Sequence, residues 1–337
     1  MFRKFIIIIS LVLLGSASAL VYQFDQVLKT PLAIEKSSFL KIKAGSSISS
    51  FAKQLERIQW IPTRFWLRNY GRLFPQKANI KAGTYLIAKN STLAQLLAQL
   101  VEGKEHQFLV TFIEGTRFKD ALTMLADHPY IKQTIQDSDI SKIATMLGVK
   151  AKNPEGWLFP DTYAFTADTL DITLLKRAYI NMQVQLDKAW KKRADNLPYK
   201  TPYQALIMAS IIEKETSYIP EQPLISSVFV NRLRKNMRLQ TDPTIIYGLG
   251  DRYQGDITRA HKREKTAYNT YRINGLPPTP IALSGLSALK ATLHPSTSEY
   301  FYFVSNANGR HVFSKTLSEH NSAVRDYLKK QRQKREK

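Results

Sequence analysis

A glutamate lies within an apolar helical pattern in the middle of the chain, in residues 209–216, which read Ala-Ser-Ile-Ile-Glu-Lys-Glu-Thr. At about 3.6 residues per turn, Glu215 shares one helix face with three apolar side chains, those of Met208, Ile211 and Ile212. Glu213 points to the opposite side. Because burial disfavours the charged form of a carboxyl group and raises its pKa, Glu215 is a candidate proton donor.

The predicted end of this helix favours the same interpretation. Residues 217–220 end the helix, because Pro220 cannot continue it and disfavours helical geometry in the residue before. Glu215 then lies at the helix C-terminus, where the negative end of the helix dipole also disfavours a charged carboxylate. On spacing alone, a buried glutamate held by a neighbouring Arg or Lys is the alternative.

Several elements must position this glutamate. Apolar spacing predicts helices over residues 174–190, 202–216 and 224–236. Asp242 followed by Pro243 is typical of a helix N-cap and first turn, and predicts a short helix through Tyr247.

Strand patterns occur at both ends of the same domain. Residues 108–113 form one strand pattern. Residues 300–305 and 310–314 flank the turn sequence Asn306-Ala307-Asn308-Gly309, which indicates a β-hairpin. We therefore predict a mixed, mainly helical domain over residues 108–328. The basic residues 329–337 are expected to be a frayed, solvated tail.

The N-terminus predicts export. A basic tip, residues 1–4, precedes an apolar run over residues 5–24, which is long enough to cross a bilayer as a helix. Arg3 and Lys4 should stay in the cytoplasm, so the rest of the chain is expected outside the cytoplasmic membrane. A cleaved signal peptide is the alternative, because Ala17-Ser18-Ala19 resembles a cleavage site. The uncleaved anchor is favoured because the apolar run continues through Tyr22.

Composition restricts the partners and cofactors. The chain has 337 residues, enough for two domains after an anchor. It has no Cys, and its six His show no metal-ligand spacing, so neither a metal site nor a cofactor is expected. The net charge of +22 would suit nucleic acid in a cytoplasmic protein. Export removes that partner and favours an anionic membrane surface or wall polymer.

Between the anchor and the larger domain, residues 38–106 predict a small module. Strand patterns over 39–42 and 79–87 enclose two helix patterns, one capped by Ser49 and one starting at Pro62-Thr63. Ser91 opens a further helix. The βααβ order resembles a LysM-like module, a fold that binds the sugar backbone of peptidoglycan and chitin. A spacer domain without a ligand is the alternative. The fold class is therefore α+β, with an N-terminal transmembrane helix, this module and the larger domain.

Motifs of the larger domain resemble those of the YceG-like family of endolytic murein transglycosylases. These motifs are residues 211–216 (Ile-Ile-Glu-Lys-Glu-Thr), 230–233 (Val-Asn-Arg-Leu), 237–244 (Met-Arg-Leu-Gln-Thr-Asp-Pro-Thr), 268–271 (Tyr-Asn-Thr-Tyr), 275–278 (Gly-Leu-Pro-Pro) and 294–295 (His-Pro). The resemblance covers the whole chain. It implies that Glu215 is the catalytic acid, in agreement with the helical pattern.

The implied chemistry needs one carboxylic acid. Protonated Glu215 donates a proton to the glycosidic oxygen between N-acetylmuramic acid and N-acetylglucosamine. The same carboxylate then accepts the proton of the muramyl C6 hydroxyl, which closes onto C1 and leaves a 1,6-anhydro end. Hydrolytic glycosidases mostly use two carboxylates, and Asp242 and Glu221 are the nearby candidates. Asp242 is expected to cap a helix and Glu221 to lie in solvent, but neither expectation excludes hydrolysis.

Five further residues are candidates for substrate binding. The amides of Gln240, Asn231 and Asn269 could hydrogen-bond sugar hydroxyls or acetamides, whereas Tyr268 and Tyr271 could stack on a ring or orient the glutamate. For each of them, a buried polar group satisfied by the backbone is the alternative.

Three functions remain open from the sequence. The first is a lytic transglycosylase that cuts nascent peptidoglycan strands and ends their elongation. It would be a single-pass protein of the inner membrane, with its N-terminus in the cytoplasm and its catalytic domain in the periplasm. The second is a muramidase-type hydrolase on the same site, and the third is a non-enzymatic peptidoglycan-binding scaffold. The resemblance and the location imply penicillin-binding glycan polymerases as partners.

Overall fold

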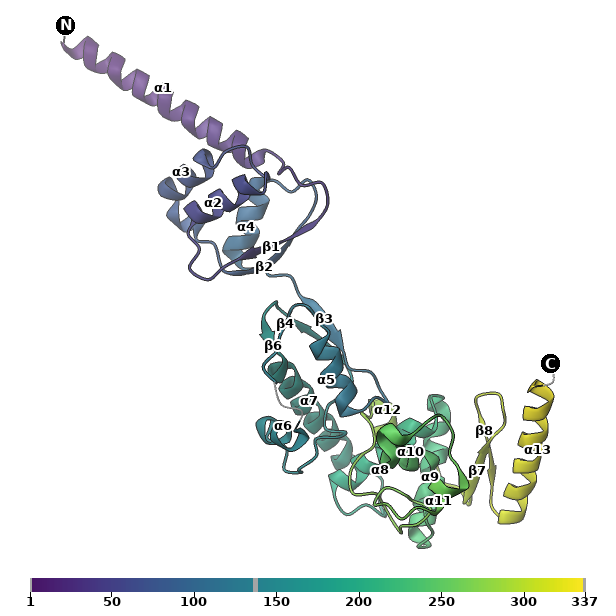
Figure 1. Cartoon of the computed structure of the whole chain (residues 1–337). Helices are drawn as coiled ribbons and strands as arrows, with labels where there is room; N and C mark the ends of the chain where they lie inside the picture. The colour runs from purple at the N-terminus through teal and green to yellow at the C-terminus, as the bar shows by residue number, and fades with distance from the viewer. Residues whose placement is uncertain (1, 136–138, 336–337) are drawn as a thin grey trace. The chain divides into compact units, whose positions relative to one another are not determined.

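The computed structural model describes residues 2–135 and 139–335 and divides into two compact units (Figure 1). The N-terminal unit comprises Met1–Phe108 together with Ala164–Asp168. The C-terminal unit comprises Leu109–Tyr163 and Thr169–Lys337. Glu215 belongs to the C-terminal unit.

The chain begins with a long helix, α1 (Phe2–Lys29). Within the described residues, its stretch Phe5–Lys29 is the one helix long and apolar enough to span a membrane, and its mean hydropathy reaches 2.4. The helix contains the whole predicted anchor, residues 5–24. It is consistent with a single-pass membrane anchor.

The rest of the N-terminal unit contains the predicted βααβ order. Strand β1 (Ser38–Ile42) pairs antiparallel with β2 (Gly83–Ile87), with Leu40 opposite Tyr85. Between the two strands lie α2 (Ile48–Arg57), α3 (Phe65–Leu73) and the 3₁₀ turn η1 (Pro75–Ala78), and α4 (Leu93–Glu102) follows β2.

Two predicted helix caps in this unit were one or two residues off. Ser47, not Ser49, accepts the hydrogen bond from the backbone of Ser50 at the start of α2. Thr92, not Ser91, forms a capping box with Gln95 at the start of α4. Ser and Thr are both favoured N-cap residues, so local sequence alone does not identify which of several neighbours caps the helix.

The first part of the C-terminal unit contains short strands and helices. Strand β3 (Phe108–Thr111) pairs with β5 (Thr162–Phe165), although Phe108, Ala164 and Phe165 are counted with the N-terminal unit. Strand β4 (Ile131–Lys132) pairs parallel with β6 (Thr169–Leu170). The helices here are α5 (Phe118–Ala126) and α6 (Ile140–Leu147).

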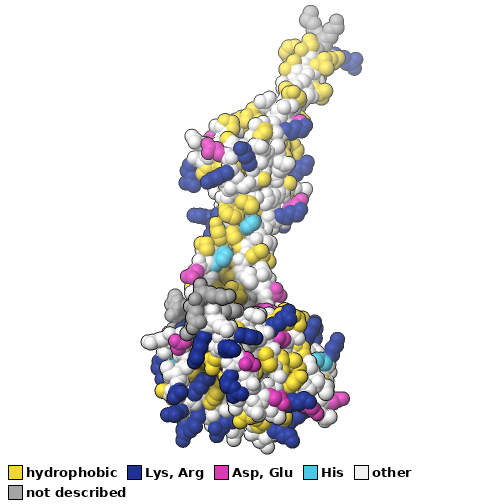
Figure 2. All heavy atoms as spheres, turned by 90° about the vertical axis from the view of Figure 1, so that its right-hand side faces the viewer, with side chains coloured by type: hydrophobic (Ala, Val, Ile, Leu, Met, Phe, Trp, Pro, Cys, Tyr) yellow, Lys and Arg dark blue, Asp and Glu magenta, His cyan; other side chains and the backbone are white. Residues whose placement is uncertain are grey.

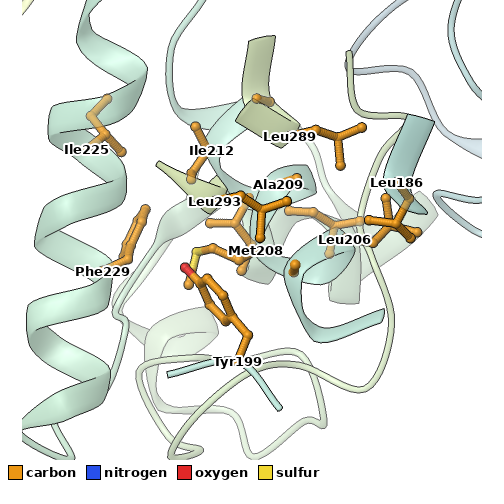
Figure 3. Packing of buried hydrophobic residues seen from close by; sticks show 14 of the residues in the cluster. Leu186, Tyr199, Leu206, Met208, Ala209, Ile212, Ile225, Phe229, Leu289 and Leu293 are labelled. Atoms are coloured by element: carbon orange, nitrogen blue, oxygen red, sulfur yellow. The ribbon is translucent and has the colours of Figure 1, made fainter. Parts of the chain in front are cut away.

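A helical bundle follows, with α8 (Pro202–Glu215) at its centre. Thr201 caps α8 through the backbone NH of Gln204, and Pro202 occupies the first turn. Every side chain from Ala205 to Ile212 is buried. Figure 3 shows α8 side chains packed against Ile225 and Phe229 of α9 (Gln222–Arg234) and Leu289 and Leu293 of α12 (Leu286–Leu293). Glu215 is therefore held at the end of a rigid, buried helix.

The bundle also contains one long helix, α7, and several short elements. They are α7 (Asp171–Lys191), η2 (Ile219–Glu221), α10 (Asp242–Leu249), η3 (Gly250–Arg252) and α11 (Arg259–Arg263). The predicted helices over 174–190, 224–236 and 242–247 thus correspond to α7, α9 and α10, with ends that differ by one to three residues.

The chain ends in a hairpin and a helix. Strands β7 (Tyr302–Ser305) and β8 (His311–Ser314) pair antiparallel, as predicted. Helix α13 (Leu317–Arg335) packs on both strands and continues into the segment expected to be frayed. Thr316 accepts a hydrogen bond from the backbone NH of Glu319 at the start of α13. The contacts of α13 with the hairpin stabilise the helix, since tertiary packing supplies most helical stability in proteins.

Candidate functional site

Glu215 lines a cavity of about 520 Å³ in the C-terminal unit. The cavity is bounded by the end of α8, by Arg232 of α9, by residues 239–242, and by side chains of β7, β8 and α13. The Glu215 residue is half-buried, so its carboxyl group is shielded from bulk water and still faces open space. This combination suits a group that exchanges a proton with a ligand.

The environment of Glu215 favours its protonated form. Burial is the main cause, and the negative charge of Asp242 adds to it, so that the pKa rises from 4.5 to about 7. Two groups act in the opposite direction: Thr241 donates a hydrogen bond from its hydroxyl to Oε1, and the Arg232 guanidinium is close by. Glu215 is therefore poised to give up or accept a proton near neutral pH.

Glu213 has a different environment on the other side of α8. Its Oε2 accepts a hydrogen bond from the backbone NH of Gly285 at 2.9 Å. Burial raises its pKa to about 6, but it does not line the cavity. The helical pattern separated these two glutamates correctly.

Asp242, the first candidate for a second carboxylate, also lines the cavity, and two side chains bind it. The Tyr271 hydroxyl donates to its Oδ1 at 2.7 Å, and Lys262 Nζ lies 3.2 Å from the same oxygen. The predicted capping role was wrong, because Thr241 occupies the N-cap position of α10 and Asp242 is the first helical residue. Asp242 instead acts on Glu215 through its negative charge.

Glu221, the other candidate, is not in solvent as expected. Its side chain is only 14% exposed, and its Oε2 lies 2.9 Å from Nδ1 of His311 in β8. The partner is 90 residues away in sequence, so local pattern could not identify it. The pair joins η2 to the C-terminal hairpin.

Arg232 is a cavity residue that sequence reasoning missed. Its Nε donates to the carbonyl of Phe301 at 2.6 Å, and its Nη1 donates to the carbonyls of Arg238 and Leu239 at 3.2 and 2.8 Å. The guanidinium also lies over the Tyr302 ring, 5.1 Å from the centroid. Arg232 thus holds the segment before Thr241 and the start of the hairpin. The sequence signal that could have identified Arg232 was its position in the motif of residues 230–233.

Gln240 lines the cavity beside Thr241. Its φ of 53° lies in the left-handed region, which non-glycine residues seldom adopt. Its Oε1 accepts a hydrogen bond from Nη1 of Arg232 at 3.3 Å, and its backbone NH donates to the Thr270 carbonyl at 3.2 Å. Such backbone strain is frequent at functional sites.

The other four predicted binding residues divide into two groups. Tyr271 lines the cavity with Glu215 and Gln240. Asn231, Tyr268 and Asn269 are not among the cavity-lining residues. The Asn231 amide donates to the carbonyls of Ser298 and Tyr300 at 2.9 and 3.0 Å.

The contacts of Asn269 and Tyr268 are likewise internal. The Asn269 amide donates to the carbonyls of His261 and Glu264 at 3.0 and 2.6 Å. The Tyr268 hydroxyl lies 2.8 Å from Oγ1 of Thr279. These contacts correspond to the alternative in which a buried polar group is satisfied within the protein.

The hairpin and α13 form the remaining cavity wall. Tyr302 of β7 stacks on His320 of α13, with ring centroids 5.2 Å apart, and both line the cavity. His311 and Asn321 add polar groups to the same wall. Within residues 2–135 and 139–335, no group of three or more His, Asp or Glu side chains could hold a metal ion. Glu215 and the polar side chains that line the cavity suit it to acid–base chemistry on a polar ligand.

A sequence model of the YceG-like family matches residues 40–326, and the chain belongs to this family. It is 30% identical to an endolytic murein transglycosylase of Bacillus subtilis (strain 168), over 88% of this chain and 86% of that protein. It is 24% identical to the endolytic murein transglycosylase of Streptococcus pneumoniae (strain D39), over 96% of this chain and 64% of that protein.

A solved structure agrees with this assignment. The crystal structure of a YceG-like protein from Listeria monocytogenes is similar with a TM-score of 0.54 and 31% sequence identity. The match covers 86% of this chain and 99% of the Listeria chain.

Proposed function

We propose that this protein is a peptidoglycan lytic transglycosylase, a lyase that cuts glycan strands internally between N-acetylmuramic acid and N-acetylglucosamine. The observation that carries the proposal is Glu215, a carboxyl group with a pKa of about 7 that faces the cavity from the end of a buried helix. The names of the Bacillus and Streptococcus relatives support the same substrate class.

Glu215 performs both proton transfers of the proposed reaction. As an acid it protonates the glycosidic oxygen, and the bond to C1 of the muramyl sugar breaks. The resulting carboxylate accepts the proton of the C6 hydroxyl, whose oxygen forms a bond to C1. The products are a 1,6-anhydromuramyl end and a free hydroxyl on N-acetylglucosamine. The proton returns to Glu215, and no water is consumed.

The neighbours of Glu215 assist each half of this cycle. The negative charge of Asp242 keeps Glu215 protonated before the first step. The hydroxyl of Thr241 and the charge of Arg232 stabilise the carboxylate that forms after it. Lys262 and Tyr271 bind Asp242, which makes it a poor second base for an attacking water.

The proposed location is the outer face of the inner membrane. Helix α1 serves as a single-pass anchor with its N-terminus in the cytoplasm and the catalytic unit in the periplasm. Anchoring places the enzyme beside nascent strands, so that cleavage ends their elongation. Penicillin-binding glycan polymerases are the proposed neighbours, and the LysM-like module is the proposed glycan-binding element.

The test is mass analysis of purified glycan strands after incubation with the full-length protein in detergent. We expect internal fragments with 1,6-anhydromuramyl ends from the wild type, and a loss of at least about 10³-fold in rate for Glu215→Gln. Glu213→Gln is the matched control, because it changes a half-buried glutamate on the same helix outside the cavity, and it should retain most activity.

Two other outcomes would replace the proposal. Fragments heavier by one water would indicate a muramidase-type hydrolase and would direct attention to Asp242. Unchanged strands with the folded wild-type protein would favour a non-enzymatic peptidoglycan-binding scaffold.

A further inference from the structure

Helix α3 packs against α1 at the level where the proposed membrane span ends. A bilayer core of about 30 Å takes about 20 helical residues, so a span that begins at Phe5 ends near Phe24. Phe24 is buried, and its ring lies 5.4 Å from that of Trp66 and 6.2 Å from that of Tyr70. Both partners belong to α3. This helix is therefore at headgroup depth when α1 spans a membrane.

An aromatic series extends from this contact to the protein surface. The Phe65 ring lies 5.2 Å from Trp66, and the Phe74 ring lies 5.1 Å from Tyr70. Phe65, Leu73 and Phe74 are 49, 62 and 40% exposed. Trp and Tyr are enriched at membrane–water interfaces, and exposed Phe and Leu beside them are typical of helices that lie in the interface.

The charged side chains of residues 57–101, which include α3, are all positive. Residues 57–101 contain no Asp or Glu, and their basic side chains are Arg57, Arg64, Arg68, Arg72, Lys77, Lys81 and Lys89. Arg64, Arg68 and Arg72 follow each other at four-residue spacing, so they form one row along α3, and like charges at this spacing repel each other. Figure 2 shows Lys and Arg side chains on the N-terminal unit near the apolar surface of α1.

Few side chains of the protein neutralise or hydrogen-bond the arginines of this row. Arg64 is the one member of the row with an ion-pair partner among the described residues, Glu56, at 3.7 Å. The Nε of Arg68 is buried and has no hydrogen-bond partner in the described chain. A row of this kind is complementary to anionic phosphate groups.

We propose that Arg64, α3 and η1, residues 64–78, form a second membrane contact that docks on an anionic lipid surface. Phe65, Leu73 and Phe74 enter the boundary between headgroups and acyl chains. The row of Arg64, Arg68 and Arg72 binds lipid phosphates. The contact fixes the N-terminal unit against the bilayer instead of leaving it to pivot on α1. This inference rests on the anchor of the proposed function.

The test uses the full-length chain reconstituted in lipid vesicles. Because the chain has no cysteine, single cysteines can carry a spin label without background. Leu73→Cys reports the proposed contact. Leu109→Cys is the matched control, since Leu109 lies in the other unit and is 61% exposed, against 62% for Leu73. Leu13→Cys reports insertion of α1.

In vesicles containing phosphatidylglycerol, the label at position 73 should collide about tenfold less with an aqueous nickel chelate than the label at 109, and more with oxygen. Arg64→Glu combined with Arg72→Glu should abolish this protection. Lys43→Glu combined with Lys53→Glu gives the same change in net charge within the same unit and should leave it intact.

Each other result overturns the inference. If the label at position 73 is exposed to water while the label at position 13 is in the bilayer, the proposed α3 contact is wrong and the anchor stands. An aqueous label at 13 removes the anchor and the contact together. Equal loss of protection in both charge-reversed variants would mean that the net positive charge of the unit, not the arginine row, attracts the anionic lipid. If added glycan strands protect the label at position 73 and vesicles do not, the surface binds the wall polymer instead.

Discussion

Thr241 donates a hydrogen bond from its side chain to Oε1 of Glu215, which joins the residue before α10 to the last residue of α8. The two residues are 26 positions apart in sequence. The bond stabilises the carboxylate form of Glu215 and opposes the effect of burial on its pKa. It therefore sets how readily the same group can act first as an acid and then as a base.

Replacing this donor should change the pH dependence of turnover. Thr241→Val removes the hydrogen bond, so the pKa of Glu215 should rise and the alkaline limb of the rate profile should move up by about half to one pH unit. Turnover should fall about tenfold because the carboxylate loses its orientation. Steady-state rates between pH 5 and 9 measure both effects. Thr241→Ser keeps the hydroxyl and should behave like the wild type; an unshifted profile for the valine variant would exclude this role.

Protein stability should fall as the pH rises from about 5 to 7. In this window the folded protein retains the proton of Glu215, with its pKa of about 7, whereas the unfolded chain has lost it. The stabilisation is complete below the unfolded pKa and disappears through the folded one. Buried Glu155, also with a pKa of about 7, and Glu213, with one of about 6, act in the same direction.

Glu215→Gln should remove one of these contributions, about 1.4 kcal/mol per pH unit within the window. Calorimetric thermal midpoints at pH 5, 6, 7 and 8 give the slope. Glu35→Gln, at an exposed position in the N-terminal unit, is the control and should leave the slope unchanged. A steeper slope in the Glu215 variant would contradict the direction of the pKa shift.

Arg232 should be needed for both structure and chemistry. Arg232→Lys keeps the charge but cannot reach the carbonyls of Leu239 and Phe301 together, so we expect a loss of about 2 kcal/mol in the free energy of unfolding. At 25 °C the loss of turnover should exceed the loss of folded protein, because the segment that carries Thr241 is no longer held in place. Arg234→Lys is the control, since Arg234 bonds one exposed carbonyl, that of Asn196. Equal effects of the two substitutions would count against a specific role.

The pair of His311 and Glu221 should hold the cavity wall formed by the hairpin. His311→Ala removes the contact at 2.9 Å, so substrate binding should weaken and KM should rise severalfold, with a smaller change in kcat. Val312→Ala changes the next residue on the same strand, whose side chain is 43% exposed, and should leave KM unchanged. A fall in kcat at constant KM would place His311 in the chemistry rather than in binding.

The separation of Glu215 from Glu213 could be predicted because it depends on the helical period alone. Burial alone did not separate them, because α8 is buried on all sides from Ala205 to Ile212; the two side chains differ in direction, and only that of Glu215 lines the cavity. Helix ends were predicted less well, because adjacent Ser and Thr residues offer equivalent caps, as at Ser47 and Thr92.

The roles of Arg232, Asn231 and Glu221 could not be predicted because their partners are remote in sequence. Phe301 is 69 residues from Arg232, Ser298 is 67 from Asn231, and His311 is 90 from Glu221. An amide or guanidinium that binds a remote carbonyl has the same local sequence pattern as one that binds a sugar. Only the folded chain distinguishes the two.

The cavity around Glu215 is completed by late segments of the chain. Its lining extends from Glu215 to Val324, and the hairpin and α13 supply Tyr302, His311 and His320. In the proposed topology, a chain whose export proceeds from the end of α1 onward lacks a finished cavity until α13 has crossed the membrane. Incomplete translation or translocation products would carry the acid without its enclosure. Under the proposed function, the order of the elements would delay cleavage of glycan strands until the chain is complete.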